Sequence, residues 1–360
     1  MKKPIFILCI IMIVLTACST ARQKLSPQGN VNLKTADVYY SQQNVEQAEA
    51  YYKKVLEDNP DYVIALRRLG DISLYNAETF TAREVEFYES AYHYYTKAIS
   101  ITEQFTELTD QDRIDLKDMK KRKERAWTRI YNAAAKEKAA GNTQKAMEIF
   151  ELAHKLEPER PEPMIQLKNI YLVDLKDDAK AEQILLQLLT KDPDKLEYLM
   201  ELGSFYYNKQ NYAEAVKYFE KARPLIPTNI DNLMNISACY YEMKDYAKAM
   251  AATKAALEIE PNNIDILDNA RSIAAQMQDI DQAIIYLKRK LEIRPEEEDF
   301  SMLATYLYNK QDWPELIKYA EEWYNFDKSN KIAVEYVIWA AQQSGNKQVE
   351  TKYAAIKKTL

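Results

Sequence analysis

Two consecutive units of 34 residues lie between positions 196 and 261, and they match at eight positions. A fixed period of this length is typical of a chain built from stacked repeats, so it constrains the fold more than any local motif does. The first unit carries Leu199, Leu202, Gly203, Tyr206, Ala215, Phe219, Ala222 and Pro227, and the second carries Leu233, Ile236, Ser237, Tyr240, Ala249, Thr253, Ala256 and Pro261.

The spacing within each unit predicts a pair of helices. From Leu199 to Tyr206 the apolar and small positions recur at i, i+3, i+4 and i+7, which places them on one helix face. The positions from Ala215 to Ala222 do the same for a second helix, and Pro227 ends it. Helices of roughly 13 residues are marginal alone in water, so the pairs must be stabilised by stacking on their neighbours.

This pattern resembles the tetratricopeptide repeat (TPR), an antiparallel helix pair of 34 residues. The small residue Gly203, the aromatic Phe219 and the final Pro227 all stand in register with that family. The resemblance implies an all-α, right-handed superhelical solenoid of about eight to nine antiparallel helix pairs. It implies a binding role only by analogy, because fold alone does not define function.

Composition agrees with a helical, non-catalytic chain. Only 5 of the 360 residues are Gly, against 27 Tyr, and 29% are charged. So few glycines leave little material for phosphate-binding loops, and no nucleophile, metal-ligand or dinucleotide motif is present. The formal net charge of −6 argues against nucleic acid as the main partner. We therefore expect no enzyme activity, no cofactor and no metal.

The first 18 residues have the features of a secretory leader. Lys2 and Lys3 precede an apolar run at 5–15 that is too short to span a bilayer comfortably. The run ends in Leu-Thr-Ala-Cys at 15–18, which resembles a bacterial lipobox. That resemblance implies cleavage after residue 17 and acylation of Cys18, hence stable membrane anchoring; an ordinary signal or an uncleaved anchor is the alternative.

Residues 18–30 are predicted to be the lipidated cysteine and a flexible tether, with a reach on the order of 20 Å for twelve residues. Ser19 directly after the cysteine favours the outer membrane by the rule for enteric lipoproteins. The expected location is therefore the cell envelope, facing the periplasm.

The remaining repeats divide the chain further. Residues 31–104 are predicted to hold repeats one and two with an insertion at 75–90, which forms a longer helix or a loop. Residues 105–126 are a charged helical extension, and 127–360 hold repeats three to nine with a C-terminal capping helix. A capping-box pattern at Thr109 and Asp112 predicts one long helix over 109–140. Repeat four contains one extra residue.

Several isolated residues could in principle carry chemistry. Cys239 is the single cysteine outside the leader, and it is predicted to be a buried apolar residue rather than a reactive thiol. His93 and His154 have no ligand-like neighbours in sequence and are predicted to lie on helix surfaces. An enzyme remains conceivable only if the insertion at 75–90 builds a pocket.

The run at 117–125 holds six Lys or Arg residues and two acids. It either contacts anionic lipid headgroups or an acidic partner, or it is the solvated face of a long helix, which is the favoured interpretation. The acidic run at 296–299 opens a helix, where acids complement the helix dipole.

In TPR proteins, the first helix of each pair lines the concave surface of the solenoid. Carried onto this sequence, the resemblance implies a binding groove that includes a broken stripe of tyrosines, which supply rigid area with a polar tip. Alternatively, these tyrosines only cover neighbouring helices. The predicted groove residues are Met200, Tyr207, Asn208, Met234, Tyr241, Tyr308 and Asn309.

The charges of the predicted groove bear on its partner. Chaperone-binding TPR domains hold a peptide carboxylate with Lys and Asn, whereas here Met200 and Met234 occupy such places, so that clamp is absent. Four acids recur at the mouth of successive repeats and favour a neutral or basic ligand: Glu197, Asp231, Asp265 and Glu298.

The sequence therefore predicts a membrane-anchored scaffold or adaptor that binds a protein or peptide partner, neutral or basic rather than acidic, through its concave groove. An accessory factor for peptidoglycan or glycan synthesis is the alternative within the binding class.

Overall fold

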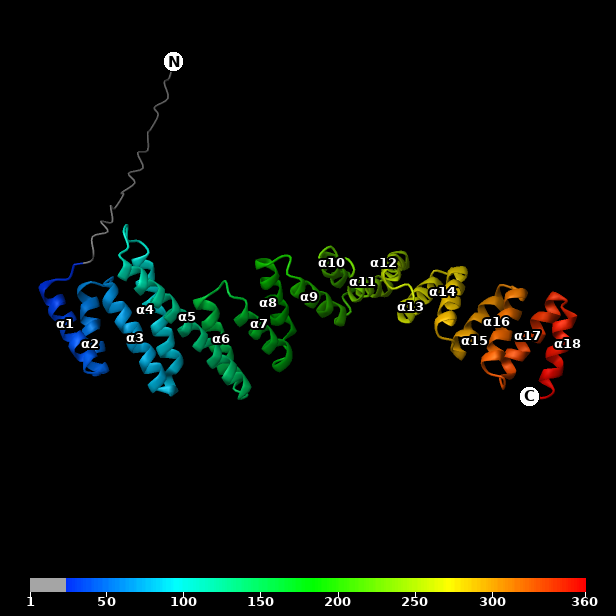
Figure 1. Ribbon diagram of the computed structural model, residues 1–360, viewed down its shortest axis with the longest axis horizontal. Coiled ribbons are helices and arrows are strands. Elements are labelled where there is room, and N and C mark those ends of the chain that lie inside the picture. Colours follow the sequence, from blue (N-terminus) through cyan, green and yellow to red (C-terminus); the bar gives the residue numbers. More distant parts are fainter. Residues whose placement is uncertain (1–23) are drawn as a thin grey trace, which may run out of the picture. The chain divides into compact units, whose positions relative to one another are not determined.

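The computed structural model describes residues 24–360, and all regular structure in that part of the chain is helical (Figure 1). Cys18 and the other leader residues lie outside the described residues. The chain divides into two compact units, the first ending at Ile184 and the second covering Leu185–Leu360. Each is described by itself below.

The first unit stacks helices that pack each on the next in chain order. They are α1 (Pro27–Ser41), α2 (Val45–Asp58), α3 (Val63–Thr79), the short 3-10 helix η1 (Thr81–Arg83), α4 (Glu84–Thr102), α5 (Asp110–Ala139), α6 (Thr143–Leu156), α7 (Glu162–Asn169), the π-helical turn η2 (Ile170–Asp174) and the start of α8 (Asp178–Lys191).

Within the second unit, too, each helix packs on the next in chain order. Its helices are α9 (Leu196–Asn208), α10 (Tyr212–Ala222), α11 (Ile230–Glu242), α12 (Tyr246–Ile259), α13 (Ile264–Gln276), α14 (Ile280–Ile293), α15 (Glu297–Asn309), α16 (Trp313–Phe326), α17 (Lys331–Ser344) and α18 (Lys347–Lys357). In the last helix, Tyr353 is buried against Val334 and Val337 while the lysines are exposed, as suits an end cap.

The turn inside most of the described pairs has one recurring construction. A residue in the left-handed region ends the first helix, and an Asn or Asp side chain then caps the second. Gln210 has φ 59° and precedes Asn211, whose side-chain oxygen accepts from the amide of Glu214. The same turn recurs at Gln43, Lys244, Gln278, Gln311 and Gly345. The caps satisfy amides that would otherwise lack partners.

Small and large side chains compensate each other between paired helices. A methyl group added to Gly203 would lie 2.5 Å from the ring of Phe219, and one added to Gly70 would lie 2.7 Å from Tyr95. In the repeat that follows Gly203 and Phe219, Ser237 stands in place of the glycine and Thr253 in place of the aromatic residue. Their hydroxyl oxygens are 2.7 Å apart. The volume of the pair, rather than either residue alone, sets the distance between the helices.

We expect Gly203→Ser to lower the free energy of unfolding by about 1–3 kcal/mol, because the ring of Phe219 must shift. Phe219→Thr alone should cost more, since it opens a cavity. The double variant reproduces the pair found at 237 and 253, so its loss should be smaller than the sum of the two. Urea denaturation followed by circular dichroism measures all three, and strict additivity would contradict the compensation.

The predicted tether is wrong at its end. It extended to residue 30, whereas α1 already begins at Pro27, a favoured first helical residue. The side chain of Ser26 caps the helix by accepting from the amide of Gly29, 2.9 Å away, and the amide of Ser26 donates to Asp58 of α2. These contacts bind residues 26–30 to the first repeat.

The insertion and the extra residue have structural explanations. The insertion at 75–90 lengthens α3 to 17 residues and α4 to 19, with η1 between them. The extra residue of repeat four produces the π-helical turn η2, because one added residue within a helix widens a turn to an i→i+5 bond. The amide of Leu175 accordingly donates to the carbonyl of Ile170.

The long helix is confirmed. α5 covers Asp110–Ala139, and Thr109 and Asp112 form the predicted capping box. Cys239 is fully buried, and burial raises the pKa of its thiol to about 11, which confirms an apolar packing role. None of the helices between residues 24 and 360 contains an apolar stretch of the length that spans a bilayer.

Candidate functional site

The first helices of the pairs in the second unit carry the predicted groove residues. Met200 and Tyr207 lie on α9, and both are half-buried against the core around Ile236 and Cys239. Met234 and Tyr241 on α11 are half-buried in the same way against the next cluster. Asn208 and Asn309 are exposed at the ends of α9 and α15. The methionines therefore serve mainly as packing residues.

The three stripe tyrosines share one local geometry. Each packs edge-on against the aromatic residue five positions later, at the start of the following helix. Ring centroids are 5.3 Å apart for Tyr207 and Tyr212, and 5.5 Å apart for Tyr241 and Tyr246. Burial raises the pKa of Tyr207. Tyr207 and Tyr241 are also half-buried, which favours the covering role for these two and leaves one tyrosine as the better surface for a partner.

Tyr308 is that tyrosine, because 40% of it is exposed. Its ring lies 6.3 Å from Trp313 and 4.4 Å from Trp339 of α17, and Trp313 is in turn 5.0 Å from Trp339. A hollow of about 630 Å³ opens beside this cluster. It is lined by Tyr308, Ile332, Glu335, Tyr336, Ile338, Trp339, Gln342 and Lys357.

A second hollow, of about 640 Å³, shares Ile332 with the first, and Ile332 is 56% exposed. Its other lining residues include Ser301 and Thr305 of α15, together with Glu297 and Glu298. The two hollows form a continuous surface on α15 and α17 that combines aromatic area, hydroxyl groups and acids. We call this surface the terminal groove.

Sequence reasoning missed the contribution of α17. Repeat nine is degenerate, so the groove register was not extended to it. Its apolar positions Val334, Val337 and Ile338 nevertheless align with Leu199, Leu202 and Gly203, which puts Trp339 in register with Ser204, four residues after the groove residue Met200. That alignment was the available signal for Trp339.

The four acids at the mouths of the repeats are all exposed in the first turns of their helices. Within residues 24–360, no hydrogen bond or ion pair is formed by the carboxylates of Glu197, Asp231, Asp265 and Glu298. Their charge complements the helix dipole, and it is also available to a basic ligand.

Asp299 has a different environment from these four. It is 3% exposed, and its Oδ1 lies 3.0 Å from Nζ of Lys290, itself 6% exposed. Asp268 Oδ2 is 2.8 Å from the same nitrogen. Burial raises the pKa of Asp299, whereas hydrogen bonds to Asp268 and Asp299 raise the pKa of Lys290 against the effect of its own burial. Asp268 thus helps to hold α13, α14 and α15 together.

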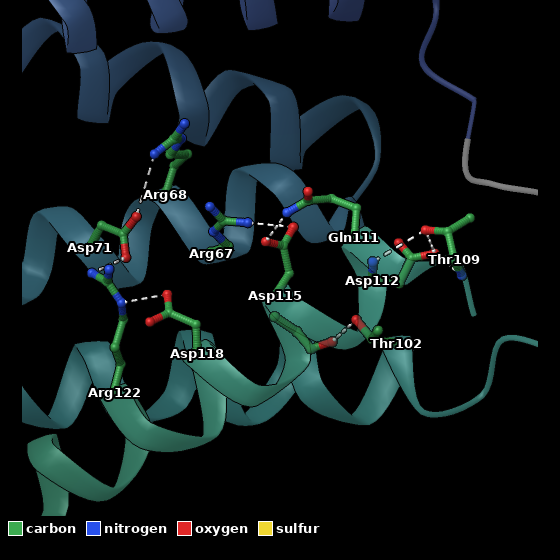
Figure 2. A network of polar contacts seen from close by, with 11 residues as sticks. Arg67, Arg68, Asp71, Thr102, Thr109, Gln111, Asp112, Asp115, Asp118 and Arg122 are labelled. Carbon is green, nitrogen blue, oxygen red and sulfur yellow. Dashed lines mark hydrogen bonds and ion pairs between the residues drawn. The ribbon is translucent and has the colours of Figure 1, made fainter.

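The first unit contains a separate pocket of about 320 Å³ between the starts of α3 and α5 and the end of α4. Figure 2 shows its polar wall, where Arg67 faces Asp115 at 2.5 Å and Gln111 donates to the same carboxylate. Its apolar wall includes Ile64, Phe105 and Met119. No lining residue comes from 75–90, so the insertion does not build this pocket.

The histidines lie apart from these surfaces. His93 is exposed on α4 with its Nε2 3.8 Å from Glu89, and His154 is half-buried on α6. Across residues 24–360, no three His, Cys, Asp or Glu side chains come together in an arrangement that could hold a metal ion.

Comparisons with known proteins support the repeat assignment. A family profile described as "Tetratricopeptide repeat" matches residues 33–98 and 171–230. A second profile, "Anaphase-promoting complex, cyclosome, subunit 3", matches residues 208–288. No curated protein matches the chain.

Similar solved structures include MamA AMB-1, with 19% identity over 47% of this chain and 92% of that chain, at a TM-score of 0.40. MamA 41-end from Desulfovibrio magneticus RS-1 has 17% identity over 46% and 94%, at 0.38. YrrB, titled "a TPR protein with an unusual peptide-binding site", has 18% identity over 51% and 90%, at 0.39. Together, the helix pairs, their core positions and the matching profile identify the chain as an all-α solenoid of tetratricopeptide repeats.

Proposed function

We propose that this chain is a non-catalytic scaffold that binds a peptide segment of a protein partner in its terminal groove. The observation that carries the proposal is the aromatic cluster of Tyr308, Trp313 and Trp339 beside an open hollow. Rigid aromatic side chains near the centre of a contact surface are the usual anchors of protein interfaces. The hydroxyl groups of Ser301 and Thr305 and the adjacent acids would fix the orientation of a bound segment.

The charges favour a neutral or basic ligand. Glu298 is exposed, and its carboxylate is close to the terminal groove. Glu335 and Lys357 form an ion pair of 2.8 Å at the other hollow, so this cation is already matched by an acid. An acidic peptide in the terminal groove would meet the uncompensated charge of Glu298, whereas a basic peptide would be attracted to it.

A peptide library displayed on phage and selected against the full chain tests this function. We expect the selected sequences to combine an aromatic or aliphatic anchor with Lys or Arg. A selection that yields acidic sequences, or none that compete with one another, would contradict the proposed site. Selective retention of peptidoglycan fragments in place of peptides would instead favour an accessory role in cell-wall synthesis.

Reversing the charge of Glu197, Asp231, Asp265 and Glu298 to lysine should weaken binding of the selected basic peptides by roughly tenfold at low salt, with a smaller effect at high salt. Fluorescence anisotropy of labelled peptides measures the change. The matched control converts four exposed acids on second helices to lysine and should leave affinity unchanged: Glu151, Glu258, Glu292 and Glu322. Unaltered affinity in the fourfold variant would refute the charge preference.

We also propose that Cys18 is acylated and anchors the chain in the cell envelope, facing the periplasm, at the outer rather than the inner membrane because Ser19 follows the cysteine. In cells fed an alkyne-labelled fatty acid, the wild-type chain should take up label and fractionate with membranes. Cys18→Ala should lose the label. Equal labelling of both chains would exclude this site of acylation.

A further inference from the structure

The first half of α5 extends beyond the helix that should cover it. α5 has 30 residues and α6 has 14. Near the end of α6, the carbonyl of Ala153 accepts from the indole of Trp127, and Glu157 pairs with Lys123 at 2.9 Å. The end of α6 is therefore level with residues 123–127 of α5. Residues 110–122 continue past it for roughly 20 Å.

The inner face of this overhang, residues 110–122 of α5, forms ion pairs with α3. Asp115 pairs with Arg67, and Arg122 lies 3.0 Å from Asp71 of α3 (Figure 2). Met119, between them on the same face, is fully buried. Four cations of the basic run pair with acids: Lys120 with Glu103, Arg122 with Asp71 and Asp118, Lys123 with Glu157, and Arg125 with Glu78.

The outer face of the overhang has a different composition. Arg113, Lys117 and Lys121 follow one another at intervals of four, and all are exposed. Within residues 24–360, neither Lys117 nor Lys121 takes part in an ion pair or hydrogen bond. Leu116 lies among them in one shallow hollow, and Ile114 beside them is 61% exposed. A helix face with cations around apolar side chains suits the boundary between water and lipid.

The position of this face points to the occupant. The amide of Ser26, just before α1, donates to Asp58 at the end of α2. Lys97 near the end of α4 then donates to the carbonyl of Pro60, and the starts of α3 and α5 share one pocket wall. The first described residues and the start of α5 thus lie at the same end of the helix stack.

Because α1 begins at Pro27, only residues 19–26 separate it from Cys18. Eight residues reach at most about 29 Å when fully extended. We propose that the outer face of residues 113–121 docks on the surface of an anionic phospholipid bilayer, an inference that rests on the proposed anchoring at Cys18. The basic run therefore has two roles: most of its cations hold the unit together, and Lys117 and Lys121, with Arg113, face headgroups.

The test uses the full chain with the photoreactive residue benzoylphenylalanine in place of Ile114. The chain is reconstituted in vesicles of phosphatidylcholine alone, or of phosphatidylcholine with phosphatidylglycerol. After irradiation, mass spectrometry measures the fraction of chain that carries a phospholipid. We expect roughly tenfold more adduct on the anionic vesicles, and loss of this excess in high salt or in Lys117→Glu/Lys121→Glu.

Two controls match these changes. Lys221→Glu/Lys254→Glu alters the same charge at exposed positions of the second unit and should keep the adduct. Benzoylphenylalanine in place of Ile285, which is 44% exposed, should give equally low yields on both vesicle types. Equal yields at position 114 on the two vesicle types would overturn the docking proposal, as would adducts that survive the reversal of Lys117 and Lys121 or require an added acidic protein.

The experiment measures anchoring and docking separately, by flotation of the vesicles and by the yield of crosslinked lipid. If the chain does not float with phosphatidylcholine vesicles, the proposed anchor is wrong, and the yield at position 114 on anionic vesicles still decides the docking proposal. If the chain floats with both vesicle types but shows no dependence on phosphatidylglycerol, the anchor stands and the docking face is wrong.

Discussion

Lys290→Ala is expected to lower the free energy of unfolding by about 3–5 kcal/mol, because it leaves a buried carboxylate without its counter-charge. The side chain of Lys290 is only 8% exposed and that of Asp299 only 4%, with 3.0 Å between their charged atoms. Asp299 Oδ2 already has no hydrogen-bond partner within the described residues. Removing the ammonium group would remove the contact that makes its burial tolerable. Urea denaturation followed by circular dichroism measures the loss.

Two comparisons separate this effect from a simple change of charge. Lys310→Ala removes an ion pair to the exposed carboxylate of Asp281, and it should change stability little. Lys290→Met combined with Asp299→Leu removes both buried charges and should be less destabilised than Lys290→Ala alone. If Lys290→Ala is no worse than Lys310→Ala, the buried cluster does not stabilise the packing of α14 on α15.

Acidification should reduce the loss of stability caused by Lys290→Ala. Burial already raises the pKa of Asp299 in the wild-type chain, and loss of Lys290 should raise it further. A carboxyl group whose pKa is higher in the folded than in the unfolded chain favours folding when protonated, and this contribution is lost as pH rises through the folded pKa. The difference between variant and wild type should therefore be largest at neutral pH and shrink toward pH 4.

Trp339→Ala and Tyr308→Ala are each expected to weaken the binding of selected peptides by about 30-fold or more, the size typical of an aromatic hot spot. The two rings contact each other at 4.4 Å, so the double variant should lose less than the product of the single effects. Fluorescence anisotropy with the selected peptides gives the affinities, and circular dichroism verifies that helicity is retained.

The control for these variants is Tyr75→Ala, which removes a 54% exposed tyrosine from α3 in the first unit and should leave affinity unchanged. Tyr207→Ala is a poor test of binding, because its ring packs on Tyr212 and the change should first reduce stability. If the selected peptides bind Tyr308→Ala/Trp339→Ala as tightly as they bind the wild-type chain, the binding site lies outside the terminal groove.

The repeat architecture could be predicted because its signals are local. A 34-residue period, the helical spacing within it and the capping box at Thr109 all involve residues close in the chain. Even the extra residue of repeat four was visible, although its form as a π-helical turn was not. The start of α1 was placed four residues too late because Ser26 and Pro27 were assigned to a polar tether rather than to a helix cap.

The candidate site was harder to predict because surface exposure depends on what packs beside each residue. Tyr207, Tyr241 and Tyr308 share one register, yet only Tyr308 is joined by a tryptophan from a later helix and stays exposed. Trp339 belongs to a degenerate repeat, where weak sequence periodicity hid its position. Two neighbouring acids, Glu298 and Asp299, also differ completely, since one faces solvent and the other meets Lys290 in the interior.

The sequence by itself determined the helix pairs, their order and the small and large residues that interlock within each pair, because one repeat is a local unit whose pattern recurs. Only the tertiary structure decided which charges are used internally and which surfaces remain uncovered. The basic run at 117–125 reads as one patch in sequence, but in the fold four of its cations pair with acids of other segments, whereas Lys117 and Lys121 remain unpaired within the described residues on a stretch of α5 that α6 does not reach. Such a division depends on relative helix lengths and on contacts between residues far apart in the chain, which periodicity does not encode.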